Sequence, residues 1–422
     1  MLINRIKGNK DYKALVSNFS YLTLLQVAGY LFPLITIPYL SRVIGTTGIG
    51  RVAFGAAVIT WFMSISTWGF NFTATREAAR NRDDLKKLAQ IFSNVFWARI
   101  TLAFFCLVIL LLLIVLIPSF NDNKLVILIT YLTIPASILF PEWLFQALER
   151  MKYITILSLV SKFLFTLSIF IFVKEPDDYY LDPLMSVMGS FVAGCIALYI
   201  IIHKWGIKIV KPSIKVTLRT IKGGTDVFIN NFMPNLYNSM SYVLLGVFSG
   251  NAANGILAAG EKCLSICEQF LTILARTFFP FLSRHGEKHG AYAKISIATS
   301  SFLAIILFVF APLFIRFFYT DDFSDAIVVA KILAVSIIFL TLNNVYGTNY
   351  LILNGGERPL RNISMICSIT GFILAVVFIK LWGFYGAAMV IVLVRGITSL
   401  LIMSYSYKFK KLQNEKNRLN IS

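Results

Sequence analysis

Charged side chains inside long apolar stretches are the residues of this chain with the clearest capacity for chemistry. The ionisable residues within those stretches include Arg99, Glu142, Lys162, Asp226, Glu261, Lys262, Glu268, Arg276 and Arg395. If the stretches cross a bilayer, a charge at a helix centre costs about 2.5–3.5 kcal/mol to insert. Such charges are therefore expected to face the interior of a helix bundle, where they pair with each other or contact a ligand.

The cations of this set outnumber the acids and predict a cavity that binds anions. The predicted substrate contacts are Arg99, Lys162, Lys262, Arg276 and Arg395. Arginine offers bidentate donors to phosphate oxygens, and lysine acts as a point charge. The acids Glu142, Glu261 and Glu268 are expected to balance these cations or to couple transport to an ion. For each single residue the alternative is capping, snorkelling or an ion pair that serves packing only.

Polar side chains also recur at helical spacing inside the apolar stretches. One face carries Asn343, Tyr346, Tyr350 and Asn354, and an earlier stretch carries Asn231 and Asn235. Tyrosine and asparagine suit a hydrated wall that forms hydrogen bonds with a polar ligand. The alternative is that such stripes join neighbouring helices by hydrogen bonds within the membrane.

The elements that must position these residues are predicted to be membrane helices. The chain of 422 residues is 57% hydrophobic and only 14% charged, and its mean hydropathy is +0.75. A membrane-spanning helix needs about 20 apolar residues. Twelve apolar stretches meet this description: 15–39, 49–69, 91–117, 124–146, 154–173, 183–202, 225–248, 253–280, 293–318, 326–353, 362–380 and 384–405. We therefore expect an all-α polytopic membrane protein with about twelve transmembrane helices.

The distribution of charge predicts the orientation of these helices. With the N-terminus inside, Lys and Arg far outnumber Asp and Glu in the cytoplasmic segments, and acidic residues prevail in the external segments. Basic loops stay in the cytoplasm. Both termini and the loop 204–222 are therefore expected inside, and Pro176 to Tyr180 outside. A basic patch for nucleic acid would need a soluble domain, which the hydropathy leaves no room for.

A weak internal repeat divides the chain into halves. Gly45, Gly50 and Gly55 recur 205 residues later as glycines 250, 255 and 260, and LFQALER at the end of the fourth stretch resembles ILNGGER at an offset of 208. Six spans in each half give both halves the same orientation, which is a parallel repeat. We expect an N-terminal lobe at 1–203, a basic cytoplasmic linker at 204–222, a C-terminal lobe at 223–406 and a basic tail at 407–422.

Three segments of the sequence resemble a known family. The segments LVSNFSYLTLLQVAGYLFPLITIPYLSRVIG, GFNFTATREAARNRDD and FPEWLFQALERMKYI are similar to those of the polysaccharide-biosynthesis flippases. These are the O-antigen (Wzx-type) members of the multidrug/oligosaccharidyl-lipid/polysaccharide exporter superfamily. The resemblance implies a MATE-like fold of two six-helix lobes around a central cavity, alternating access, and no enzymatic activity. It implies a polyprenyl-pyrophosphate-linked oligosaccharide as substrate, flipped from the cytoplasmic to the outer leaflet of a bacterial cell (inner) membrane for O-antigen or lipopolysaccharide biosynthesis. A polysaccharide polymerase and a chain-length regulator are its expected partners.

Two other function classes are kept as alternatives. A cation-coupled multidrug exporter would share the fold, but the first span contains no Asp or Glu to bind a cation. A membrane polysaccharide polymerase would need a larger external loop for its chemistry. No nucleotide-binding motif is present, and the five cysteines and three histidines form no pattern of a metal site, so no cofactor is expected.

Overall fold

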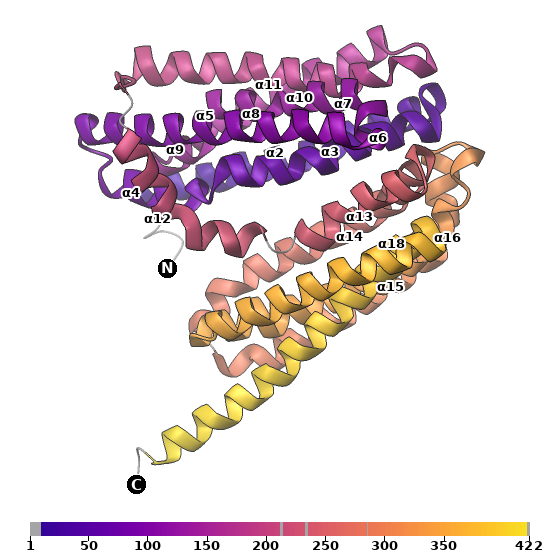
Figure 1. Cartoon of the computed structure of the whole chain (residues 1–422). Coiled ribbons are helices and arrows are strands. Elements are labelled where there is room, and N and C mark those ends of the chain that lie inside the picture. The colour runs from indigo at the N-terminus through magenta and orange to yellow at the C-terminus, as the bar shows by residue number, and fades with distance from the viewer. Residues whose placement is uncertain (1–9, 212–213, 233–234, 285, 420–422) are drawn as a thin grey trace. The chain divides into compact units, whose positions relative to one another are not determined.

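The computed structural model describes residues 10–419 except 212–213, 233–234 and 285, and for some helical residues it describes the backbone alone (Figure 1). Within this part of the chain every regular element is a helix and no strand occurs. The all-α prediction is confirmed. Contacts divide the chain into two compact units. Unit 1 contains the described residues up to Ile44 together with Gly55–Phe232, and unit 2 contains Gly45–Phe54 and the described residues after Phe232. The lobe boundaries expected from the sequence stay a prediction.

Unit 1 contains long helices interrupted by short turns. In chain order its elements are α2 (Lys10–Val43), α3 (Gly45–Thr67, whose first turns belong to unit 2), α4 (Phe70–Arg80), α5 (Leu85–Leu116), α6 (Pro118–Asp122), α7 (Lys124–Tyr131), α8 (Thr133–Leu139), α9 (Glu142–Ala147), α10 (Met151–Phe172), η1 (Pro176–Tyr180), α11 (Leu181–Tyr199), η2 (Ile200–Lys204) and α12 (Ile214–Phe232).

Unit 2 also consists of long helices and short helical turns. Its further elements are α13 (Asn235–Phe248), α14 (Asn251–Arg284), η3 (Gly286–Lys288), α15 (His289–Phe318), η4 (Asp321–Phe323), α16 (Ala326–Ala334), α17 (Ser336–Leu342), η5 (Asn343–Leu351), η6 (Ile352–Asn354) and α18 (Glu357–Leu419). α18 has one non-helical residue, Gly383, at φ 55° and ψ −131°. A positive φ favours glycine. Gly383 therefore separates the predicted stretches 362–380 and 384–405.

Helix α5 shows how the sequence sets the ends and faces of a membrane helix. Its N-cap Asp84 accepts hydrogen bonds from the backbone N–H groups of Lys86 and Lys87, both at 3.1 Å. Capping by a carboxylate satisfies donors that have no partner within the helix. Near the other end, Val115 is 83% exposed and Leu116 is 72% exposed. Large apolar side chains this exposed are stable against lipid rather than water.

Nine helical segments within the described residues are long and apolar enough to cross a membrane. The predicted stretches 362–380 and 384–405 fall within one of them, Glu357–Lys411. The predicted span 225–248 covers the end of α12, the undescribed residues 233–234 and α13, and it stays a prediction. The chain is a multi-pass membrane protein, and the count of twelve spans stays a prediction.

The repeated glycines lie at the start of α3 and α14. Within unit 2, a Cβ atom added to Gly50 would lie 1.7 Å from the carbonyl oxygen of Asn251, and one added to Gly255 would lie 2.1 Å from that of Thr46. Real Cβ atoms do not approach this closely. The first turns of α3 therefore pack backbone to backbone on α14, which explains why Gly45–Phe54 belongs to unit 2.

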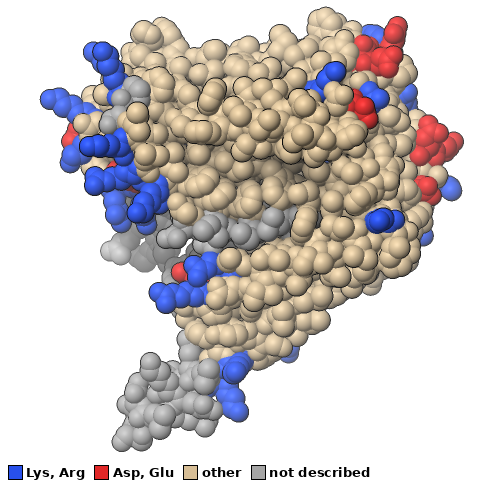
Figure 2. All heavy atoms as spheres, in the orientation of Figure 1, with Lys and Arg blue, Asp and Glu red and all other residues tan. Residues whose placement is uncertain are grey.

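Charges gather at the ends of the helices in each unit. In unit 1, Figure 2 shows most Lys and Arg atoms at the left-hand end of the bundle and acidic atoms at its right-hand end. In unit 2 the acidic atoms also lie at one end, where η4 carries Asp321 and Asp322. The middle of each bundle shows almost no charge, as a layer in contact with hydrocarbon requires.

Candidate functional site

Arg99 is the most deeply placed cation of unit 1. It lies on α5 and is 4% exposed. Its two terminal nitrogens donate to Ser137 on α8, Nη1 to the backbone oxygen at 3.0 Å and Nη2 to Oγ at 2.7 Å. The buried Nε of Arg99 has no hydrogen-bond partner. A buried guanidinium with an unused donor is expensive to maintain, which marks it as a candidate for binding an anion.

Glu142 lies beside this arginine because the helix breaks before it. α8 ends at Leu139, and the backbone N–H of Glu142 donates to the oxygen of Phe140 at 2.9 Å. Pro141 between them has no N–H and cannot continue the helical ladder. The first residues of α9 after Glu142 anchor this turn, since Trp143 is only 2% exposed and packs in the hydrophobic core of unit 1.

Two cavities of unit 1 meet at this turn. One of about 370 Å³ is lined by Arg99, Ser137 and Glu142. The other, of about 260 Å³, is lined by Glu142 and Lys162. Phe140 and Ser190 line both. The structure thus brings together three residues that the sequence predicted separately. Serines dominate the remaining polar lining, a signal that the sequence reading missed because serine is common in membrane helices.

The two cations of these cavities form no ion pair with a carboxylate of the described residues. Among the ion pairs found between described residues, none involves Arg99, Glu142 or Lys162. Glu142 lies in the field of both cations at a longer distance. The site therefore has two positive groups around one acid, and neither cation is neutralised by direct contact.

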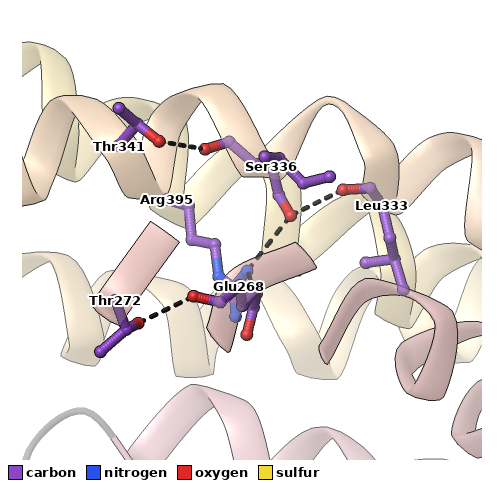
Figure 3. Close-up of polar contacts among 7 residues, drawn as sticks. Glu268, Thr272, Leu333, Ser336, Thr341 and Arg395 are labelled. Atoms are coloured by element: carbon purple, nitrogen blue, oxygen red, sulfur yellow. Dashed lines mark hydrogen bonds and ion pairs between the residues drawn. The ribbon is translucent and has the colours of Figure 1, made fainter. Parts of the chain in front are cut away.

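Arg395 of unit 2 has a different environment. Figure 3 shows its guanidinium against Glu268, and Nη1 forms an ion pair with Oε1 of that residue. The same Nη1 donates to Oγ of Ser336 at 3.2 Å. The contact joins α18, α14 and α17, and the two charged side chains are 16% and 24% exposed. The arginine predicted as a cavity cation is therefore neutralised by one of the predicted acids.

The second acid of unit 2 is also held by a neighbour. Tyr242 on α13 donates its hydroxyl to Oε2 of Glu261 on α14 at 2.7 Å. Lys262, the next residue, is half-buried and is not among the lining residues of the cavities described in this part of the chain. The side chains of Arg276, Asn231 and Asn235, three predicted site residues, lie outside the described part of the structure.

A larger cavity of about 670 Å³ lies within unit 2. Tyr346, Tyr350 and Asn354 line it, as the polar stripe predicted. Asn343 is not in its lining. The amide oxygen of Asn343 lies instead near Gly347, 2.8 Å from the position of an added Cβ.

The wide helical turn of η5 explains this difference. Residues 343–351 form a π-helix, in which each turn holds more residues than an α-helix. Residues chosen at α-helical spacing therefore do not all lie on one side of this segment. Asn349 lines the cavity and Asn343 does not, and the sequence reading missed Asn349. His289, Lys294 and residues near the end of α18 also line the cavity, and their distance in sequence hid them.

No group of three or more His, Cys, Asp or Glu residues that could hold a metal ion occurs among the described residues. The features of the site are a helix break, buried cations and open polar cavities inside an apolar helical bundle. These features define a polytopic membrane protein of the transporter type.

The chain belongs to the polysaccharide biosynthesis protein family, whose model matches residues 15–286. A relative from Escherichia coli (strain K12), named "Putative O-antigen transporter", is 26% identical over 94% of this chain and 97% of its own length. A relative of the same name from Shigella dysenteriae is 22% identical over 93% of this chain and 99% of its own.

Solved structures of the same fold are transporters as well. The lipid II flippase MurJ in an inward closed conformation matches with a TM-score of 0.68 at 14% identity, over 93% of this chain and 87% of that one. An inward-facing multidrug resistance MATE family transporter of the MOP superfamily matches with a TM-score of 0.62 at 13% identity, over 90% and 96%. The two-lobe MATE-like fold and the family resemblance are confirmed. The relatives are named as transporters and flippases, in accordance with a chain that is not an enzyme.

Proposed function

We propose that this protein flips a polyprenyl-pyrophosphate-linked oligosaccharide from the cytoplasmic to the outer leaflet of a bacterial inner membrane. The repeat unit of an O-antigen or a similar surface polysaccharide is the expected cargo. The names of the relatives support the general class. The observation that carries the proposal is Arg99, a buried arginine in a cavity of unit 1 without a carboxylate in direct contact.

The pyrophosphate is the part of the substrate that needs such a group. Its charge has to leave water during transit, and the free energy of that step falls if protein donors replace water. Arg99 offers an unused Nε donor, and Lys162 adds a point charge in the adjoining cavity. Glu142 between them keeps the empty site from carrying two uncompensated cations.

Alternating access between the two units is the proposed mechanism. Outward movement of a negative head group follows an inside-negative membrane potential, which assists by about 2.3 kcal/mol per charge per 100 mV. We further propose that both termini face the cytoplasm and that a polymerase and a chain-length regulator receive the product outside.

A deletion strain tests the function. Lipid-linked repeat units should accumulate on the cytoplasmic leaflet and surface polysaccharide should disappear, and the wild-type gene should restore both. Normal surface polysaccharide in the deletion strain contradicts the proposal. Efflux of cationic dyes, measured in the same strains, should not change. A loss of dye efflux with intact polysaccharide would favour the multidrug exporter instead.

Labelling of single cysteines tests the orientation. An impermeant thiol reagent should modify a cysteine at Asp178 in intact cells and should not modify one at Ser213. The native cysteines are replaced first. The reverse pattern would place both termini outside and contradict the proposed orientation of the chain in the membrane.

A further inference from the structure

One residue in the lining of the unit 2 cavity has a buried polar atom without a hydrogen-bond partner. Asn349 is 2% exposed and lines the cavity. Its amide nitrogen donates to the backbone oxygen of Ala275 at 3.1 Å and to the hydroxyl of Tyr292 at 2.6 Å. The backbone oxygen of Ala275 only accepts hydrogen bonds, so the amide must present its nitrogen there. The amide oxygen Oδ1 consequently has no partner.

An unused acceptor at this depth needs a donor from a ligand. A buried polar group without a hydrogen bond costs about 1–3 kcal/mol. Hydroxyl and amide groups of a saccharide are donors of the required kind. An ionised carboxylate has no hydrogen to offer and cannot satisfy Asn349 by itself, so the ligand needs neutral polar groups as well.

Aromatic rings line the same cavity. The ring of His289 lies 5.0 Å from that of Tyr350 and 5.9 Å from that of Tyr346, and its Nε2 lies 3.0 Å from the backbone oxygen of Val345. The hydroxyls of Tyr346 and Tyr407 are 3.0 Å apart. Aromatic faces carry partial negative charge and attract the C–H groups of a sugar ring, while tyrosine hydroxyls contact its oxygens. The volume of about 670 Å³ falls in the range of small-ligand sites.

The charged groups of the lining favour an anion. Lys294 and Lys410 line the cavity from α15 and α18, against the single acid Glu287. Both lysines are exposed, so they lie where the cavity opens. The buried end of the site is thus neutral and polar, and the open end is basic.

We propose that this cavity binds a saccharide that carries a carboxylate or another anionic substituent, with Asn349 at its buried end and Lys410 at its opening. The site is distinct from the Arg99 cavities of unit 1. The inference rests on the proposed function for the origin of the saccharide, which is the glycan of the transported lipid. It adds that unit 2 recognises the sugar, separately from the recognition of pyrophosphate.

Calorimetric titration of the full chain in nanodiscs tests the site. The probes are a tetrasaccharide of alternating glucuronic acid and N-acetylglucosamine, the same tetrasaccharide with its carboxylates reduced to alcohols, and inorganic phosphate. The acidic tetrasaccharide should bind about tenfold more tightly than the reduced form, since one charge-assisted contact is lost. Equal affinity for both tetrasaccharides, or binding of phosphate alone, would overturn the proposal.

Variants separate the site from general surface charge. Lys410→Gln should weaken binding of the acidic tetrasaccharide about two- to fivefold, because an exposed charge contact contributes at most about 1 kcal/mol, and should leave the reduced form unchanged. Lys408→Gln is the matched control, because Lys408 is exposed on the same helix and is not in the lining. Asn349→Leu should weaken both tetrasaccharides. If Asn349→Leu fails to fold, the comparison of the two lysines still decides. Equal effects of the two lysine variants would contradict the proposal.

The outcomes distinguish this inference from the proposed function. If no tetrasaccharide binds and the deletion strain still loses its surface polysaccharide, the saccharide site is wrong and the flippase function stands. If binding follows the predicted pattern and the deletion strain keeps its polysaccharide, the site stands and the flippase function is wrong.

Discussion

The two units of this protein each bury an arginine in the apolar interior, but they compensate its charge in different ways. In unit 1, Arg99 is held by the neutral oxygens of Ser137, and its Nε has no partner. In unit 2, Arg395 forms an ion pair with Glu268 and also contacts Ser336. Both residues were equivalent as sequence signals, because each is a single cation in an apolar stretch.

The difference separates a binding role from a structural role. A paired arginine gains little from a further anion, since the partner already supplies the opposite charge. An arginine held only by dipoles retains its charge and attracts an anion that enters the cavity. We therefore propose that Arg99 of unit 1 binds the anionic head group of the substrate, and that the ion pair of unit 2 serves the packing of α14, α17 and α18.

The largest expected effect follows from removal of the unit 1 arginine. Arg99→Ala should reduce transport at least tenfold, because charge-assisted hydrogen bonds contribute about 1.5–3 kcal/mol. Arg99→Lys should retain part of the activity, since it keeps the charge and loses the bidentate geometry. Surface polysaccharide in a complemented deletion strain measures the effect.

Lys86→Ala serves as the control for this variant. Lys86 lies on the same helix, is exposed and is absent from both cavities of unit 1. It should leave transport unchanged. Full complementation by an Arg99→Ala variant that is present in the membrane at wild-type level would remove the contrast between the two units.

The next effect concerns stability rather than transport. Glu268→Gln leaves Arg395 without its counter-charge and should lower the free energy of unfolding by about 2–4 kcal/mol, somewhat less than for a fully buried pair because both side chains are partly exposed. Thermal unfolding of the purified protein in detergent measures the loss.

A double-mutant cycle shows whether the pair acts as a unit. Replacement of both residues, Glu268→Gln with Arg395→Met, should recover much of the lost stability, because no uncompensated charge remains. Strictly additive losses would contradict a direct coupling between the two residues. They would point instead to separate roles of the two residues.

The sequence predicted the general architecture well and the contacts poorly. Helices, membrane class and buried charges follow from hydropathy and from the cost of charge in hydrocarbon, which are local properties. The ion pair between Glu268 and Arg395 does not follow from the sequence, because the two residues lie 127 positions apart. Either acid of α14, Glu261 or Glu268, could have been the one that pairs with Arg395. Only the packing of α18 on α14 decides between them.

Local geometry accounts for the other differences. The break at Pro141 places Glu142 in the lining of both cavities of unit 1. The π-helix at 343–351 was not visible, and a face drawn at α-helical spacing therefore included Asn343 and missed Asn349. Polar residues at α-helical spacing predict a shared face only where the helix keeps its regular period of about 3.6 residues per turn.

The smallest expected effect belongs to Lys162, the second cation of unit 1, and it sharpens the comparison within that unit. Lys162 is half-buried and lines the adjoining cavity, while Arg99 is almost fully buried. A partly solvated charge interacts through about 0.2–1 kcal/mol, so Lys162→Gln should lower transport about two- to fivefold. Lys152→Gln on the same helix is the control, since Lys152 is exposed and not in the lining, and it should have no effect. Rates from flipping of a fluorescent polyprenyl-pyrophosphate glycan in proteoliposomes have the necessary accuracy. If Lys162→Gln lowers the rate as much as Arg99→Ala does, the depth of burial does not set the strength of the anion contact, and both cations must bind the pyrophosphate at the same step.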